Sequence, residues 1–227
     1  MCGIVGGTSN RNILPILIEG LRRLEYRGYD SAGVAYKTNG KISLVKNAGR
    51  VDDLAAKLNL KTNKSNIGIA HTRWATHGVP SEKNAHPHNS KNNIYVVHNG
   101  IIENHSALKE MLKKEGFKFT SQTDTEVIAH LIQLYIEKGK DLDSAVISTI
   151  AKLKGAYALG VLDKNNPDTL IGVRQQSPLV IGEGFEEKFI ASDIMALSNI
   201  TNKFKFMDDG QIAILEKDQI TVTSSSG

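Results

Sequence analysis

Cysteine is nearly absent from this sequence, in which Cys2 is the only thiol among 227 residues. A single cysteine cannot form an intramolecular disulfide, which favours a reducing compartment. Long apolar runs are also lacking: none reaches the ~18 residues of a membrane-spanning helix, and no basic segment followed by an apolar stretch marks a signal peptide. We therefore expect a cytoplasmic protein that does not bind membranes.

An excess of one charge is missing too. The chain has 28 basic and 24 acidic side chains, a net charge of +4, and its lysines are scattered instead of forming a stripe. Because nucleic acids bind to clustered cations, we do not expect a nucleic-acid-binding protein. The hydrophobic content of 40% and the charged content of 23% are those of an ordinary globular protein.

Strands and helices are predicted in separate groups along the chain. The first group has strands at residues 2–7, 32–36, 41–46, 67–72 and 94–98, and one helix with apolar residues Ile13, Leu14, Leu17, Leu21 and Leu24. Three helices follow, at residues 105–115, 124–138 and 143–154, and then strands at residues 156–162, 169–174, 179–182, 189–191, 211–216 and 220–223. This pattern predicts an α+β domain over residues 1–223, in which two sheets pack face to face with helices outside. We expect residues 224–227, Ser-Ser-Ser-Gly, to begin a linker.

Local signals mark the ends of the three grouped helices. Gly116, Gly139 and Gly155 each follow one of them, as glycines commonly do at helix C-termini. The middle helix is preceded by Thr123-Asp124-Thr125-Glu126, which predicts a capping box. Asp124 would then lie at a helix start, where the macrodipole favours a carboxylate, so its position alone requires no function.

The position of Cys2 raises a chemical possibility. A thiol attacks a carbonyl as its thiolate, and because the ordinary pKa of cysteine is about 8.5 the reaction needs a base. Removal of Met1 would leave an α-amino group, with a pKa of about 7.7–8.0, on the same residue as the thiol. Cys2 would then carry both nucleophile and base, although a lone cysteine is more often a small buried apolar residue.

Two further stretches hold groups suited to acyl transfer. His98-Asn99-Gly100 ends a predicted strand in a dipeptide typical of tight turns, but an Asn amide and a Gly N–H beside a thiol could also hold an oxyanion. Arg73 stands next to Trp74, as in many packed surface pairs, yet its guanidinium also matches a carboxylate. The residues alone leave both interpretations open.

Taken in order, several stretches resemble class II glutamine amidotransferases, and most closely their hexosamine-forming branch. The resemblance runs from Cys2 to about Glu216 and is carried by CGIVG at residues 2–6, YRGYDSAG at 26–33, HTRWATHG at 71–78, NAHPH at 84–88, VHNGIIEN at 97–104 and TDTE at 123–126. It implies a four-layer αββα N-terminal-nucleophile hydrolase sandwich with two mainly antiparallel sheets. It also implies hydrolysis of L-glutamine to glutamate and ammonia through a Cys2 thioester, with no cofactor and no metal.

The same resemblance implies a longer enzyme. In that branch a sugar-isomerase domain, which is absent here, follows the glutaminase domain and uses the ammonia to make glucosamine 6-phosphate from fructose 6-phosphate. The expected partners are therefore L-glutamine, that second domain and a second copy of the enzyme in a homodimer.

Roles for individual residues are implied by the resemblance as well. Cys2 would be the nucleophile and, through its α-amino group, the base, while Asn99 and the N–H of Gly100 would form the oxyanion hole. Arg27 would support the N-terminal residue. The glutamine pocket would be lined by residues that bind its charged end or close its mouth: Arg73 on the α-carboxylate, Asp124 on the α-ammonium, Thr76 and His77 in the wall, and Trp74 as a gate toward the ammonia route.

Three alternatives compete with this interpretation. A metal site could be built from His71, His77, His86, His88 and His98, since imidazole is a common zinc ligand, but no Cys accompanies them and no His pair has the i, i+4 spacing. An N-terminal-nucleophile acylase acting on another amide would leave Arg73 and Asp124 with nothing to bind. Another class II amidotransferase would share Cys2, but residues 25–31 and 73–78 resemble the hexosamine-forming branch specifically.

Overall fold

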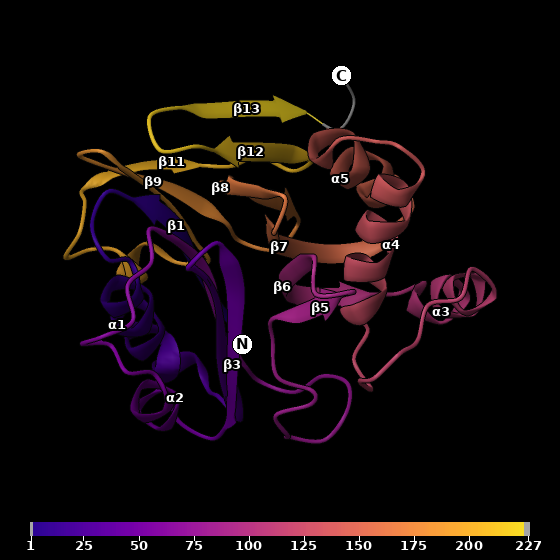
Figure 1. Cartoon of the computed structure of the whole chain (residues 1–227), viewed down its shortest axis with the longest axis horizontal. Helices are drawn as coiled ribbons and strands as arrows, with labels where there is room; N and C mark the ends of the chain where they lie inside the picture. Colours follow the sequence, from indigo (N-terminus) through magenta and orange to yellow (C-terminus); the bar gives the residue numbers. More distant parts are fainter. Residues whose placement is uncertain (1, 225–227) are drawn as a thin grey trace.

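Two antiparallel sheets lie face to face in the computed structural model, which describes residues 2–224 (Figure 1). The seven-stranded sheet has the order β11 (Lys203–Phe206), β9 (Val180–Gly184), β10 (Glu187–Ala191), β1 (Gly3–Ser9), β4 (Ile67–Arg73), β2 (Ser31–Thr38) and β3 (Lys41–Ala48). The six-stranded sheet has the order β13 (Ile220–Ser224), β12 (Gln211–Leu215), β8 (Asn166–Gln175), β7 (Gly155–Asp163), β6 (Ile94–Ile102) and β5 (His88–Ser90).

Helices cover the outer face of each sheet. The helices α1 (Leu14–Leu24) and α2 (Val51–Lys57) pack on the seven-stranded sheet, and α4 (Glu126–Glu137) and α5 (Leu142–Ile150) pack on the six-stranded one, with α3 (His105–Lys114) beside α4 (Figure 1). Short 3₁₀ turns occupy Glu25–Arg27 and Ile194–Ala196. The predicted four-layer αββα arrangement is therefore confirmed.

Alternation along β6 decides which way its polar residues face. Val97 packs between the two sheets with Ile4 and Ile69, whereas Val96 packs against the helices of the outer layer. Successive side chains of a strand point to opposite faces. Asn99 therefore faces the other sheet and the start of β1, while His98 faces the N-terminal end of α4.

The interpretation of Asn99-Gly100 as a tight turn is wrong, because both residues lie inside β6. They pair with Ala158 and Tyr157 of β7, and the strand continues to Ile102. Gly100 has φ +118°, and a Cβ on it would lie 2.0 Å from the carbonyl oxygen of Ala156. The glycine is thus required by the close approach of β7, and the local turn signal is overridden by strand pairing.

The predicted capping box is also wrong. Helix α4 begins at Glu126, and the carboxylate of Glu126 accepts hydrogen bonds from the N–H groups of Thr120 and Ser121 instead of reaching back to Thr123. The hydroxyl of Thr123 bonds to Ser121 and His88. The segment before α4 is therefore held by the preceding loop and by β5.

Other boundaries differ in smaller ways. Gly116 and Gly139, both at φ +88°, end α3 and α4 as predicted, but Gly155 begins β7, five residues after α5 ends at Ile150. Helix α2 and strands β5 and β11 were not predicted, since each is short. Ser224, expected in a linker, ends β13 and pairs with Gln211 of β12. Residues 225–227 lie outside the described residues.

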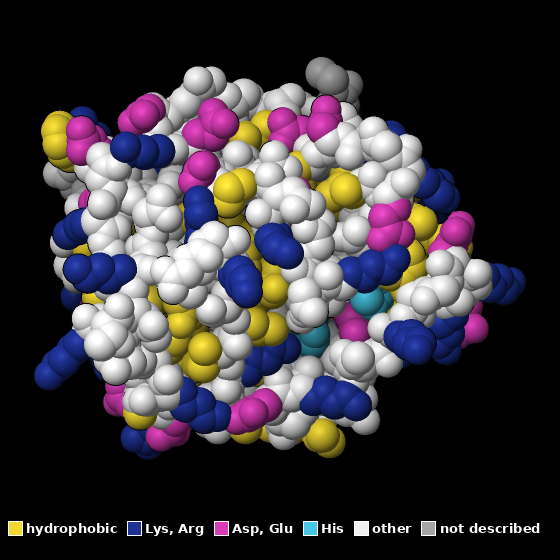
Figure 2. Space-filling view, in the orientation of Figure 1, with side chains coloured by type: hydrophobic (Ala, Val, Ile, Leu, Met, Phe, Trp, Pro, Cys, Tyr) yellow, Lys and Arg dark blue, Asp and Glu magenta, His cyan; other side chains and the backbone are white. Residues whose placement is uncertain are grey.

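The surface agrees with the scattered charge of the sequence. On the face shown in Figure 2, Lys and Arg side chains are dispersed among acidic and uncharged ones. Within residues 2–224 no helix is long and apolar enough to span a membrane.

Candidate active site

One pocket collects most of the residues that the sequence singled out. Its lining is Cys2, Arg73, Trp74, Thr76, His77, His86, His98, Gly100, Thr123 and Asp124. Asn99 is not part of this lining but contacts Cys2, with its amide nitrogen 3.2 Å from the carbonyl oxygen of Cys2. The pocket thus combines Cys2, which lies just before β1, with residues of β4, of β6, of the segment after β4 and of the segment before α4. His86, His98 and Thr123 were not predicted to line the glutamine pocket; His86 and His98 were considered only as metal ligands.

Cys2 lies just before β1, beside the end of β4. Its Sγ accepts a hydrogen bond from the N–H of Trp74 at 3.2 Å and lies 3.4 Å from the carbonyl oxygen of the same residue. The pairing of Gly3 with Thr72 produces this contact. Burial raises the pKa of the Cys2 thiol, so a base is needed to form the thiolate at neutral pH.

Arg73 is buried at the end of β4, with 3% of its surface exposed. Its guanidinium donates to the carbonyl oxygens of His77 and Gly78, the latter at 3.0 Å, and lies 3.6 Å from the carboxylate of Asp30. Arg73 therefore holds the loop that carries Thr76 and His77 around the pocket. The interpretation of Arg73 as an exposed surface pair with Trp74 is wrong.

Asp124 supplies a fixed negative charge in the pocket wall. Its Oδ2 accepts a hydrogen bond of 2.8 Å from the N–H of Ile102, and its Oδ1 lies 3.9 Å from Nδ1 of His77. The carboxylate is held by β6, not by the free N–H groups of α4. The interpretation of Asp124 as a helix cap is therefore not what the structure shows.

Trp74 and Arg27 lie at the edge of this arrangement. The Trp74 side chain is 53% exposed and lies over Gly28, on which a Cβ would come within 2.2 Å of the indole. Arg27 lines a different pocket and points to Ser192, whose Oγ accepts a hydrogen bond from the N–H of Ile4 at 3.0 Å. Arg27 thus reaches the start of β1 through Ser192, without lining the pocket of Cys2.

The histidines at this end of the molecule form a buried cluster. His71 and His86 stack with ring centroids 4.2 Å apart, and Nε2 of His88 bonds to Thr123. Burial lowers the pKa of each of His71, His86, His88 and His98, so these rings are neutral at physiological pH. Among the described residues, no three His, Cys, Asp or Glu side chains are grouped as metal ligands would be.

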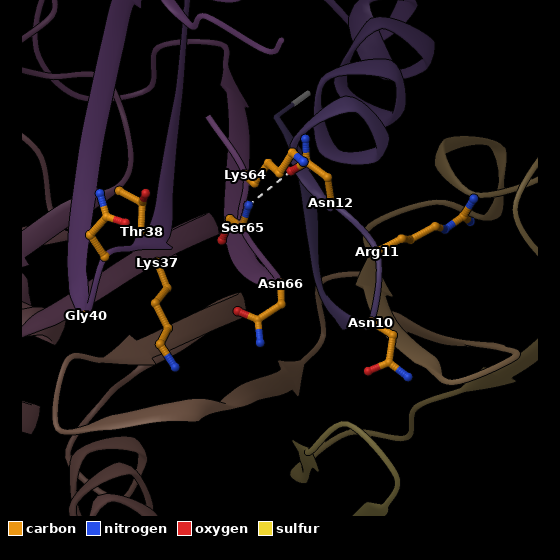
Figure 3. Close-up of a pocket in the computed structure, with 10 residues that line it drawn as sticks. Asn10, Arg11, Asn12, Lys37, Thr38, Gly40, Lys64, Ser65 and Asn66 are labelled. Atoms are coloured by element: carbon orange, nitrogen blue, oxygen red, sulfur yellow. Dashed lines mark hydrogen bonds between the residues drawn. The ribbon is translucent and has the colours of Figure 1, made fainter. Parts of the chain in front are cut away.

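A separate hollow lies at the opposite end of β1 (Figure 3). Polar and basic residues line it: Asn10, Arg11, Asn12, Lys37, Thr38, Asn39, Gly40, Lys64, Ser65 and Asn66. Two of its cations are paired with carboxylates, Arg11 with Glu187 at 2.8 Å and Lys37 with Asp168 at 2.9 Å. None of the predicted site residues contributes to this hollow.

Comparison with known proteins identifies the family. A model of the glutamine amidotransferase domain matches residues 56–224. The chain belongs to the glutamine amidotransferase family. Two curated relatives bear the name glutamine–fructose-6-phosphate aminotransferase (isomerizing): that of Pseudomonas putida is 50% identical over 228 residues, and that of Acinetobacter baylyi is 54% identical over 222. These alignments cover 100% and 98% of this chain, but only 37% and 36% of the relatives.

Solved amidotransferase structures share the fold. The glutamine phosphoribosylpyrophosphate amidotransferase of B. subtilis, complexed with ADP and GMP, aligns with a TM-score of 0.85 and 26% identity over 99% of this chain and 49% of that one. The predicted N-terminal-nucleophile amidotransferase sandwich is thereby confirmed. The identity to this second branch is about half of that to the fructose-6-phosphate enzymes, which favours the hexosamine-forming branch.

Proposed function

We propose that this chain hydrolyses L-glutamine to glutamate and ammonia by attack of Cys2 Sγ on the side-chain amide. The observation that carries the proposal is the convergence of a thiol, a carboxamide and one fixed charge of each sign at a single pocket. Glutamine has an amide at one end and a zwitterion at the other, so Cys2 with Asn99 can serve the first and Arg73 with Asp124 the second. An acyl group without charges would leave the second pair unused.

The reaction can be written with Cys2 alone as acid and base. After removal of Met1, the α-amino group takes the thiol proton, Sγ bonds to the amide carbon, and the resulting oxyanion accepts hydrogen bonds from Asn99 Nδ2 and the N–H of Gly100. The C–N bond then breaks, the leaving nitrogen takes the proton from the α-ammonium group, and ammonia departs. Water, deprotonated by the same amine, adds to the thioester carbon. The C–Sγ bond then breaks, glutamate is released, and the Cys2 thiolate regains its proton from the α-ammonium group.

In the longer protein the ammonia would be used, not released. The chain spans only 37% of its Pseudomonas putida relative, which leaves room for a second domain there. We propose that this domain is a sugar isomerase, that it converts fructose 6-phosphate and ammonia into glucosamine 6-phosphate in a cytoplasmic homodimer, and that Trp74 lies at the exit toward it. The alternative is that the second domain transfers ammonia to a different acceptor, since the chain is also 26% identical to a phosphoribosylpyrophosphate amidotransferase.

Glutamate and ammonia release from glutamine by the purified chain tests the proposal. We expect the two products in equal amounts. We expect no ammonia from a simple primary amide that lacks the α-amino and α-carboxyl groups. A chain with intact fold and confirmed loss of Met1 that releases neither product would contradict the proposed function.

Arg73→Ala is expected to raise the KM for glutamine about 10- to 150-fold. The reason is that a contact to the α-carboxylate by a charged donor contributes about 1.5–3 kcal/mol. The matched control substrate is 4-aminobutanamide, which lacks only the α-carboxylate. Because Arg73 also holds the 77–79 loop, equal losses on both substrates would show that Arg73 acts on the loop alone.

A further inference from the structure

His71 has a hydrogen-bond arrangement that fixes the orientation of Asn99. Its Nε2 lies 3.0 Å from the carbonyl oxygen of His98 and 3.0 Å from Oδ1 of Asn99. A backbone carbonyl can only accept, so Nε2 must carry the hydrogen. The amide group of Asn99 is then oriented with its oxygen toward His71 and its NH₂ toward Cys2, where Nδ2 lies 3.2 Å from the Cys2 carbonyl oxygen.

The neutral His71 ring has one donor nitrogen and one acceptor nitrogen, and this restricts the orientation of the Asn99 amide. His71 is fully buried, and burial lowers its pKa to about 3, so only one nitrogen is protonated. With the hydrogen on Nε2, the other nitrogen is an acceptor, and Nδ1 has no partner among the described residues. An unpartnered buried acceptor costs free energy that an apolar residue of similar size would not. The ring therefore serves through its Nε2–H.

We propose that His71 is a positioning residue that holds the NH₂ edge of Asn99 toward the oxyanion. The inference rests on the proposed function, in which Asn99 Nδ2 is an oxyanion donor. A 180° flip of the amide would put Oδ1 against the developing negative charge and the NH₂ group against Nε2–H of His71. The donor on His71 thus excludes the unproductive orientation, which a purely space-filling side chain would not do.

The test compares His71→Leu with His71→Gln. Gln can place its amide nitrogen near the position of Nε2 and donate, whereas Leu fills space without a donor. In His71→Leu we expect kcat to fall about 10- to 100-fold. This is less than the about 10²–10³-fold fall in kcat that follows the complete loss of an oxyanion donor. The KM for glutamine should change less than about twofold, because the residues proposed to bind the charged end of glutamine are unchanged. His71→Gln should recover most of kcat.

Two measurements distinguish a positioning role of His71 from a purely structural role. In an Asn99→Ala background His71→Leu should cost nothing more, since a positioning residue without its target has no effect. The ¹⁵N shifts of His71 in the unchanged chain should show hydrogen on Nε2. An Nδ1–H tautomer, an undiminished loss in the Asn99→Ala background, or equal kcat losses in the Leu and Gln variants at equal melting temperature would overturn the proposal. Absence of glutaminase activity in the unchanged chain would instead refute the proposed function.

A second observation concerns His98, whose tautomer is set by a chain of hydrogen bonds. The backbone N–H of His98 donates to Nδ1 of His86 at 3.3 Å, so neutral His86 carries its hydrogen on Nε2. That group lies 3.2 Å from Oγ1 of Thr125, and the Thr125 hydroxyl lies 2.9 Å from Nδ1 of His98. With Thr125 donating, His98 carries its own hydrogen on Nε2.

This Nε2–H is buried in the pocket wall without a partner among the described residues. His98 is 2% exposed, and its charged or titratable neighbours are Asp124, His77, His71 and His86. A buried donor left unpaired in the free protein costs free energy that an acceptor on a ligand recovers. The donor cannot serve the α-ammonium group, and the amide oxygen belongs to Asn99, so the acceptor that remains on glutamine is the α-carboxylate.

We infer that His98 Nε2 donates to the α-carboxylate of glutamine. This too rests on the proposed function, and the matched variants are His98→Asn, which can keep the acceptor for Thr125 but loses the Nε2 donor, and His98→Gln, which keeps a donor there. In a Cys2→Ala background, His98→Asn should weaken the glutamine Kd about 10- to 100-fold, as loss of a hydrogen bond to a charged group does. Binding of 4-aminobutanamide should not change.

The outcomes of the titration are distinct. Unchanged glutamine binding in His98→Asn, or equal weakening for 4-aminobutanamide, would overturn the role of His98. Weak binding in His98→Asn with near-parental binding in His98→Gln would support it. A Cys2→Ala parent that binds no glutamine at all would refute the proposed function itself.

Discussion

Cys2→Ala is expected to release no ammonia from glutamine while folding like the unchanged chain. The substitution removes the atom that forms the thioester, so no part of the proposed route remains. Its structural cost should be small, because Cys2 precedes β1 and the bonds of its Sγ are confined to the backbone of Trp74. Steady-state glutamate release, with the melting temperature as control, measures both effects.

A glutamine titration of the same variant tests whether substrate binding is retained when catalysis is lost. Arg73 and Asp124 remain in Cys2→Ala, so glutamine should still bind. Cys2→Ser should have measurable but far weaker activity, since a hydroxyl is a poorer nucleophile than a thiol for an amine base with a pKa of about 8. Ammonia release by Cys2→Ala at a rate near that of the unchanged chain would refute the N-terminal-nucleophile mechanism.

The state of the N-terminus controls every one of these rates. A retained Met1 would convert the proposed base into an amide, while leaving the thiol and the pocket in place. The intact mass of the chain therefore has to accompany each activity measurement. Activity should rise with pH as the α-amino group loses its proton, around the ordinary pKa of about 7.7–8.0.

Much of the architecture follows from patterns that are readable in the sequence. The αββα layering was predictable because the grouped helices have clear apolar stripes and the strands are short and numerous. The pocket was predictable through the resemblance to amidotransferases, which marked Cys2, Arg73 and Asp124 in segments far apart along the chain. Their roles remain proposals, but their convergence at one pocket is a structural fact.

Local signals failed where distant partners decide the conformation. Asn99-Gly100 is a turn signal in isolation, but pairing with β7 keeps both residues extended. Glu126 has the spacing of a capping box, yet its carboxylate accepts hydrogen bonds from the N–H groups of Thr120 and Ser121. The neighbouring residues do not reveal the pairing with β7, because that pairing comes from the fold.

The roles of the buried histidines could not be predicted from the sequence either. In the sequence, His71, His86 and His98 entered only through a metal-site alternative, against which the missing Cys partner and the spacing of the histidines argue. Which nitrogen of each ring holds the hydrogen depends on the carbonyl of His98 and the hydroxyl of Thr125, both of which are brought close only by β4, β6 and α4. The proposed roles of these rings therefore depend on the three-dimensional structure and not on any local pattern in the sequence.

Asn99→Asp is expected to lose more activity than deletion of the same side chain. If the amide donates to the oxyanion, Asn99→Ala should lower kcat about 10²–10³-fold, which is the effect of removing one such donor. Asp places an acceptor with a negative charge where the transition state develops its own, so kcat should fall further. The Nε2–H of His71 can bond to a carboxylate oxygen as it does to Oδ1, and the fold should survive.

Substrate affinity provides the contrast that makes this prediction specific. Arg73, Asp124 and the proposed donor on His98 act on the other end of glutamine, so in a Cys2→Ala background Asn99→Asp should bind glutamine within a few-fold of the parent. Glutamate release by the Asn99→Ala and Asn99→Asp variants, measured beside that titration and a melting curve, completes the comparison. A near-normal kcat in Asn99→Asp with unchanged melting would show that the carboxamide takes no part in the reaction, since its position inside β6 already excludes a turn as its purpose.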